Sequence, residues 1–124
     1  MMAAGWGRIV CISSMNAKTG GAFPALSKTA YAAAKAGMLG LIRGLARDLA
    51  PAVTANAICP GLIQTELSAA MWEGPRADAI IASIPAGRLG LPEDIANAVA
   101  FLVSDRASYI SGEALDVNGA VYVD

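Results

Sequence analysis

The sequence contains no histidine, and it has only two cysteines in 124 residues. The lack of histidine excludes a Ser-His-Asp catalytic triad or a Cys-His dyad, and it removes the commonest metal ligand. Cys11 and Cys59 form no CxxC pair, and the acidic residues do not cluster, so we expect no metal site. Both cysteines lie in apolar, strand-like runs, which is typical of reduced thiols in a cytoplasmic protein.

Charge and long apolar runs are also scarce. Charged residues make up 15% of the chain and the net charge is −1, so nothing favours binding to nucleic acid or to an anionic membrane. Lys35, Arg43, Arg47 and Asp48 interrupt the longest apolar stretch, and no membrane-spanning helix is predicted. The opening residues lack the basic and apolar regions of a secretory signal. The apolar fraction of 56% in this length indicates one domain, residues 1–124.

Three short runs have the composition of strands. Residues 8–14 and 53–59 are apolar and β-branched, which predicts strands buried on both faces of a parallel sheet, and residues 112–118 form a third. Helical patterns alternate with them, at about 30–49 and again from Pro92, where Glu93 and Asp94 complement the positive end of the helix. The alternation predicts an α/β fold with helices on both faces of the sheet.

The helix expected from about Ala30 to Leu49 is rich in glycine. Ser27 or Thr29 is the expected cap at its start, and Pro51 comes just after its end. Each of its glycines costs roughly 1 kcal/mol of helix stability against alanine. We therefore expect this helix to pack very closely against a sheet or a partner helix; its glycines are Gly37, Gly40 and Gly44.

Two connections are predicted to flank a site. Residues 15–30 are polar and contain Gly20-Gly21 and Pro24, so they are expected to form a loop that lines a pocket. Residues 66–84 alternate helix-like pieces with breakers, which indicates a lid of short helices at about 66–90. Met71 and Trp72 in this lid are expected to shape the substrate pocket.

Tyr31 and Lys35 lie four residues apart, on one face of the predicted helix. A phenol beside an ammonium can handle a proton, because a neighbouring positive charge favours the phenolate. The same spacing also occurs by chance on surface helices, where the ring only packs on the lysine stem. Ser13 and Ser14 come directly after the first strand, where ligands of open α/β sheets collect, although serines there also turn the chain or cap the next element.

The chain resembles the C-terminal half of a short-chain dehydrogenase/reductase, close in character to the 3-oxoacyl-acyl-carrier-protein reductases. Four segments carry the resemblance in the expected order over nearly the whole chain: Gly7-Arg-Ile-Val-Cys-Ile-Ser-Ser14, Tyr31-Ala-Ala-Ala-Lys35, Pro60-Gly61-Leu-Ile-Gln-Thr65 and Ser111-Gly-Glu-Ala-Leu-Asp-Val-Asn-Gly119. A YxxxK pair alone is a weak signal, whereas the ordered set is specific.

The resemblance implies NAD or NADP as cofactor and a small carbonyl or alcohol as substrate. It implies that Tyr31 donates or accepts the proton, and that Lys35 lowers the Tyr31 pKa and binds the nicotinamide ribose. Ser14 would hold the substrate oxygen, with Ser13 as the alternative. The resemblance places the cofactor against the Pro60-Gly61 turn, with Ile63, through its backbone, and Thr65 at the nicotinamide carboxamide.

The sequence also departs from the family pattern. The TGxxxGxG turn that seats the pyrophosphate and the Asn-Asn-Ala-Gly segment are absent, and the interval from Ser14 to Tyr31 is longer than usual. We therefore expect the C-terminal part of a Rossmann-like, doubly wound sheet whose N-terminal nucleotide-binding half is missing. The alternative to an oxidoreductase fragment is a non-catalytic remnant that only associates. Either way the family implies a homodimer or homotetramer through the 30–49 helix and the C-terminal strand.

Overall fold

The computed structural model describes residues 1–21 and 29–124. Its strands are β1 (Gly7–Ile12), β2 (Val53–Pro60) and β3 (Ala114–Val117). Its α-helices are α1 (Asn16–Thr19), α2 (Thr29–Asp48), α3 (Pro75–Ala82) and α4 (Pro92–Leu102), and its 3-10 helices are η1 (Met2–Ala4), η2 (Glu66–Trp72) and η3 (Asp105–Ala107). The three predicted strands and the predicted helices are confirmed, with ends that differ by a few residues.

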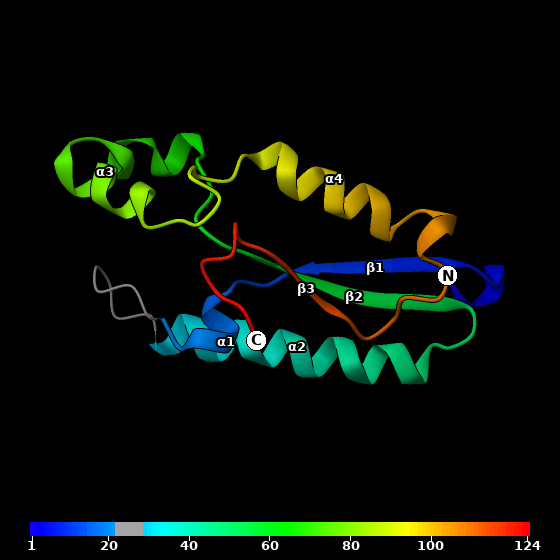
Figure 1. The fold of residues 1–124 in the computed structure, drawn as a ribbon. Coiled ribbons are helices and arrows are strands. Elements are labelled where there is room, and N and C mark those ends of the chain that lie inside the picture. The colour runs from blue at the N-terminus through cyan, green and yellow to red at the C-terminus, as the bar shows by residue number, and fades with distance from the viewer. Residues whose placement is uncertain (22–28) are drawn as a thin grey trace.

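The sheet has the order β1-β2-β3, and both pairs of neighbours are parallel. Gly7 lies opposite Val53, and Ala57 lies opposite Ala114. The carboxyl ends of the strands therefore meet at one edge of the sheet (Figure 1). Every residue from 53 to 59 is buried, as predicted for a strand covered on both faces. The same expectation for the first strand is wrong, because β1 lies at the edge of the sheet and is mostly half-buried.

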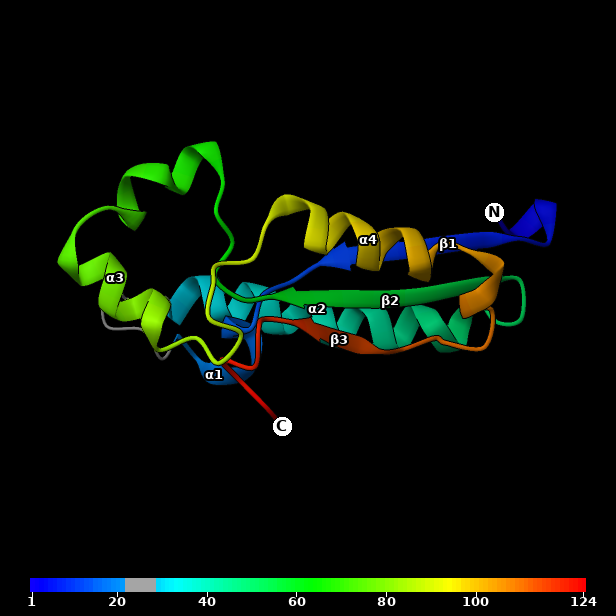
Figure 2. The same ribbon diagram turned by 45° about the horizontal axis from the view of Figure 1, so that its top comes forward.

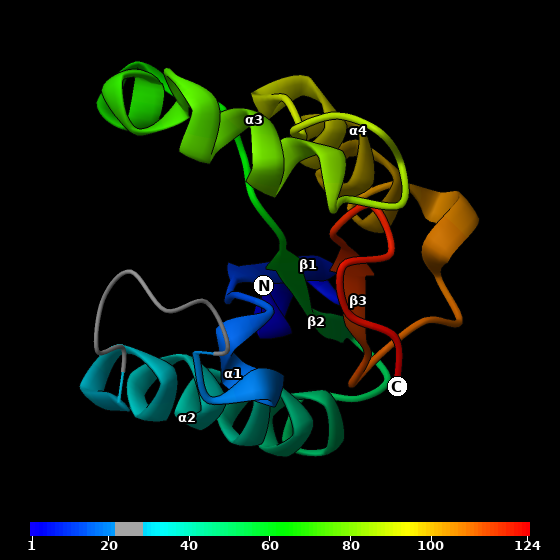
Figure 3. The same ribbon diagram turned by 60° about the vertical axis from the view of Figure 1, so that its left-hand side comes forward.

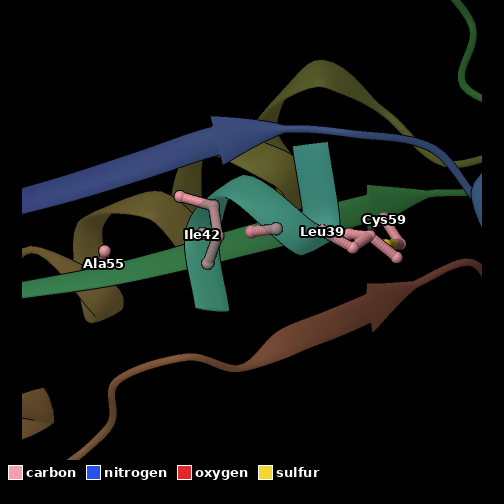
Figure 4. Close-up of a cluster of buried hydrophobic side chains, with 5 residues drawn as sticks. Leu39, Ile42, Ala55 and Cys59 are labelled. Atoms are coloured by element: carbon pink, nitrogen blue, oxygen red, sulfur yellow. The ribbon is translucent and has the colours of Figure 1, made fainter. Parts of the chain in front are cut away.

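Helices cover both faces of the sheet. α2 runs along one face and α4 along the other, as Figures 1 and 2 show from two directions. Leu39 and Ile42 of α2 pack on the small side chains of β2, where alanines let the helix approach closely (Figure 4). The buried members of this core are Leu39, Ile42, Ala55, Ala57 and Cys59.

A buried amide fixes the turn before β3. Asn56 of β2 is almost fully buried, and its Nδ2 donates to the Ile110 carbonyl at 2.9 Å. The backbone N–H of Glu113 donates to Asn56 Oδ1 at 3.0 Å. Both polar ends of the amide are thus satisfied, and the chain is held in place where it enters β3.

The glycines of α2 do not face the sheet. Gly37, Gly40 and Gly44 are exposed, and a Cβ atom added at any of them would meet nothing within 4 Å. The helix does pack on the sheet, but through its apolar side chains, so of the two expected partners the sheet is not the one that meets the glycines. The small-residue face of α2 points away from the sheet.

The predicted loop over residues 15–30 contains a short helix, so that prediction is wrong in part. The backbone N–H of Asn16 donates to Ser14 Oγ at 3.1 Å as α1 begins, and Gly20 in the left-handed region ends the helix. Thr29 is itself helical, and the other expected cap, Ser27, lies outside the described residues. In residues 1–21 and 29–124, no helix combines the length and apolar character that crossing a bilayer needs.

Candidate active site

A cleft of about 560 Å³ lies at the carboxyl edge of the sheet. Its walls come from the segment after β1, the start of α2, the turn after β2, and the η2–α3 segment. Figure 3 shows α3 on one side of this edge and the start of α2 on the other. The cleft is lined by Ser14, Met15, Asn16, Gly21, Tyr31, Gly61, Leu62, Ile63, Ser68, Met71, Trp72, Glu73, Arg76, Ala77 and Ile80.

Tyr31 and Lys35 lie on the first turns of α2, and Tyr31 lines the cleft. Lys35 Nζ lies 5.6 Å from the centre of the Tyr31 ring and donates a hydrogen bond of 2.8 Å to the carbonyl of Ile12. The lysine ammonium is therefore held between the tyrosine and the end of β1. Tyr31 itself is 43% exposed, so solvent and small molecules can reach its side chain.

The two serines after β1 have different surroundings. Ser13 is buried, and its hydroxyl donates to the backbone carbonyl of Lys35 at 2.8 Å. Ser14 lines the cleft together with Tyr31. Its Oγ accepts the N–H of Asn16, and among the described residues its hydroxyl hydrogen has no acceptor. Of the two alternatives, Ser14 is thus the one positioned to donate into the cleft.

The turn after β2 supplies the backbone wall of the cleft. Gly61 and Ile63 line the cleft, and a parallel bridge joins Ile63 to Gly90. The bridge hydrogen bonds use Gln64 N–H and the Leu62 carbonyl, so the N–H of Ile63 has no partner within residues 1–21 and 29–124. This donor fits an acceptor such as a carboxamide oxygen.

Three of the expected site residues are not among those that line the cleft: Lys35, Pro60 and Thr65. Thr65 caps η2, where its Oγ1 accepts the backbone N–H of Ser68 at 3.2 Å. The Pro60 carbonyl accepts the N–H of Met15 at 3.0 Å, which ties the turn after β2 to the start of α1. Lys35 and Pro60 thus support neighbouring residues of the cleft.

The η2–α3 segment forms the outer wall. Trp72 lines the cleft, and its Nε1 donates to Ser68 Oγ at 3.0 Å. Met71 and Ile80 add apolar surface, while Arg76 is exposed at the same wall and forms no ion pair within the described part of the chain. The wall is therefore largely apolar, with a cation available to a ligand.

Sequence reasoning found some of these residues only as part of a segment. Residues 15–30 were expected to line a pocket, and Met15 and Asn16 do line the cleft, but no motif singled them out, and none singled out Ser68. Asn16 could have been found only from the helix that begins after Ser14, and nothing local marks Met15. Ser68 lies three residues after Thr65, a spacing typical of a helix cap.

An ion-pair cluster beside the cleft holds α1 to β3. Lys18 Nζ lies 2.6 Å from Asp116 Oδ2 and 3.0 Å from Asp124 Oδ2. Burial alone lowers the pKa of Lys18, but the hydrogen bonds to Asp116 and Asp124 outweigh burial and raise this pKa above its ordinary value. The hydrogen bond to Lys18 lowers the pKa of Asp124. The cluster keeps the segment after Ser14 against the sheet.

The thiols take no part in the site. Cys11 and Cys59 are free, and Cys59 is buried among the core residues between α2 and the sheet. Burial raises the pKa of the Cys59 thiol, which disfavours the reactive thiolate. No group of three metal-ligating residues occurs in the part of the chain that the structure describes.

Comparison with known proteins identifies the family. A family model described as "Enoyl-(Acyl carrier protein) reductase" matches residues 1–121. The 3-oxoacyl-[acyl-carrier-protein] reductase of Salmonella typhimurium is 47% identical over 124 residues, which cover 99% of this chain and 49% of that protein. The chain therefore belongs to the short-chain dehydrogenase/reductase family and is similar to the 3-oxoacyl-acyl-carrier-protein reductases, as the sequence motifs predicted.

Solved structures share the fold. A protein from Thermus thermophilus matches with a TM-score of 0.86 and 39% identity, over 96% of this chain and 50% of that one. A blue fluorescent protein from a metagenomic library, in complex with NADPH, matches with a TM-score of 0.82 and 36% identity, over 94% of this chain and 45% of that one. The chain spans about half the length of the relatives that it matches.

Proposed function

We propose that this chain is the catalytic half of an NAD(P)-dependent oxidoreductase that interconverts a carbonyl and a secondary alcohol. The observation that carries the proposal is the convergence of Ser14, Tyr31 and Lys35, from two separate elements, at one edge of the sheet. The family and the NADPH in one structural neighbour support the cofactor.

Each of the three side chains has a distinct role in the proposal. Tyr31 gives a proton to the carbonyl oxygen during reduction and takes it back during oxidation. The positive charge of Lys35 near the ring stabilises the phenolate that remains. The hydroxyl of Ser14 donates to the same oxygen as negative charge grows on it, an interaction worth about 2.7–4 kcal/mol where comparable donors have been removed from other enzymes.

The cleft fits the nicotinamide end of a dinucleotide. The N–H of Ile63, which no described residue accepts, suits the carboxamide oxygen, and Gly61 leaves room beside it. Bound NAD(P)H supplies the hydride, and the protein positions the reacting groups and handles the proton. Thr65 acts in this proposal mainly through its cap of η2, which holds the end of the turn.

The isolated chain is expected to bind dinucleotides weakly or not at all, because it contains no glycine-rich turn for the pyrophosphate. We therefore design the activity test on a joined enzyme, in which the N-terminal half of the Salmonella reductase precedes these 124 residues. We expect NADPH-dependent reduction of a 3-oxoacyl thioester, followed at the NADPH absorbance. A folded joined enzyme that binds NADPH but reduces no carbonyl compound would count against the proposal. Micromolar dinucleotide binding by the isolated chain would contradict the expected weak binding.

A second candidate function is association without catalysis. The open face of α2, with its three exposed glycines, favours it because another helix could approach the backbone closely there. Sedimentation of the isolated chain tests this candidate. A stable dimer that Gly40→Leu converts to a monomer, together with a joined enzyme that reduces no carbonyl compound, would support it. A monomer at all concentrations would rule it out.

A further inference from the structure

One hydroxyl in the η2 segment makes an unusual number of contacts. Ser68 Oγ accepts the backbone N–H of Thr65 at 2.9 Å and the indole N–H of Trp72 at 3.0 Å. It also lies 3.2 Å from the carbonyl oxygens of Ile63 and Thr65, and 3.0 Å from Thr65 Oγ1. Ser68 therefore touches both the turn after β2 and the outer wall of the cleft.

These contacts saturate the hydroxyl. A serine hydroxyl has two acceptor lone pairs and a single hydrogen. The N–H groups of Thr65 and Trp72 occupy both lone pairs, so Thr65 Oγ1 cannot also donate to Ser68. The hydrogen of Ser68 is left to donate, and the carbonyls of Ile63 and Thr65 both lie within its reach.

A cap for η2 does not need all of these bonds. The reciprocal pair between Thr65 and Ser68 already caps the helix start. The bonds to Trp72 and Ile63 go beyond the cap, and both of these residues line the cleft.

Trp72 belongs to a segment that is only partly buried. None of the residues of η2 is buried, and Leu67 is almost fully exposed. The indole of Trp72 is half-buried and its one polar atom is bonded to Ser68. That bond therefore fixes the direction in which the indole N–H points.

We propose that Ser68 is a positioning residue, which uses one hydroxyl to hold the Trp72 indole and the Ile63 backbone in fixed places along the cleft. Its importance for turnover rests on the proposed function, in which Ile63 faces the nicotinamide. The linkage itself exists in the 124-residue chain and does not depend on that function.

The test measures hydrogen exchange in the isolated chain. Trp6→Phe leaves Trp72 as the sole tryptophan, so its indole N–H gives a single resonance in the spectrum of the ¹⁵N-labelled protein. In this background, Ser68→Ala is expected to raise the exchange rates of the Trp72 indole N–H and the Thr65 amide by about fivefold each, as the loss of an ordinary hydrogen bond implies. Ser68→Thr keeps the hydroxyl and is expected to preserve both rates.

Ser83→Ala is the matched control. The Ser83 hydroxyl bonds only to the Ile80 carbonyl within the described residues, and Ser83 is not among the residues lining the cleft. Its loss is expected to leave the Trp72 and Thr65 rates unchanged. If Ser68→Ala leaves the indole rate unchanged, or raises only the Thr65 rate, Ser68 is merely a cap and the proposal is overturned.

A second variant covers the case in which Ser68→Ala does not fold. Trp72→Phe, made in the original sequence, removes the indole donor and keeps an aromatic ring, and it is expected to shift the amide resonances of Ser68 and Ile63. Unchanged resonances at both positions would overturn the proposal. No measurement here involves a dinucleotide, so failure of the proposed function and failure of this inference are separate results.

Discussion

The ammonium of Lys35 donates a hydrogen bond of 2.8 Å to the carbonyl oxygen of Ile12, the last residue of β1. A second bond runs the other way, from the Ser13 hydroxyl to the Lys35 carbonyl. The start of α2 is therefore tied to the end of β1 at two points, directly beside the cleft. This cross-link sets the position of Tyr31, one turn earlier on the same helix, relative to Ser14.

Lys35→Met removes the ammonium and keeps the aliphatic stem. We expect it to lower the free energy of unfolding of the isolated chain by about 1 kcal/mol, the usual net value of one hydrogen bond. Urea unfolding followed by circular dichroism measures the change. Arg43→Met is the control, because Arg43 lies exposed on the same helix and makes no side-chain bond within residues 1–21 and 29–124. Equal effects of the two substitutions would contradict a structural role for the Lys35–Ile12 bond.

Ser14→Ala and Ser13→Ala separate the two serines. In the joined enzyme, Ser14→Ala is expected to lower kcat by roughly 10²–10³-fold, as loss of an oxyanion donor does elsewhere. Ser13→Ala is expected to lower stability more than kcat, because its hydroxyl bonds to the α2 backbone. Steady-state kinetics and urea unfolding on both variants distinguish the roles. The reverse pattern would assign the substrate oxygen to Ser13.

Ile42→Ala tests the core between α2 and the sheet. Ile42 is 1% exposed, and the cavity left by its truncation should lower the free energy of unfolding by about 2–5 kcal/mol. Leu41, its neighbour on the same helix, is 56% exposed, so Leu41→Ala is expected to change stability far less. Similar losses for both variants would mean that α2 is not seated on β2 as Figure 4 shows.

The charge of Asp94 makes stability at the start of α4 depend on pH. Hydrogen bonds from Arg88, and then from the Leu91 N–H, lower the Asp94 pKa from 3.8 to about 2. A carboxyl with a lowered pKa contributes stability above its ordinary pKa and loses it as the pH falls through the folded value. The difference in urea midpoint between the wild type and Asp94→Asn should therefore be full above about pH 4 and vanish near pH 2. A difference that persists undiminished at pH 2 would contradict the ion-pair account.

Much of the architecture could be predicted from local patterns. Apart from Asn56, residues 53–59 are apolar or small because β2 is covered on both faces, and the strand was predicted within a residue of its observed end. The edge position of β1 could not be predicted, since its composition matches that of a central strand. Leu39 and Ile42 determine which face of α2 meets the sheet. The glycines lie on other faces, and their positions in the sequence alone do not predict this; they are Gly37, Gly40 and Gly44.

The site was predictable to the extent that its residues belong to motifs. Tyr31 and Ser14 were expected together and the structure brings both to the cleft. The sequence leaves Ser13 and Ser14 as alternatives, because only the coordinates show that the Ser13 hydroxyl bonds to the Lys35 carbonyl. The ion pairs of Lys18 were not predicted, because its partners, Asp116 and Asp124, lie about a hundred positions later in the chain.

The central claim is that Tyr31 transfers the proton in the cleft. The most direct measurement compares the joined enzyme with its Tyr31→Phe variant, using single-turnover reduction of a 3-oxoacyl thioester and NADPH binding on the same samples. We predict that turnover is lost while NADPH affinity stays within a few-fold, because phenylalanine keeps the ring and removes only the hydroxyl. A Tyr31→Phe variant that reduces the substrate at the parent rate would contradict the account.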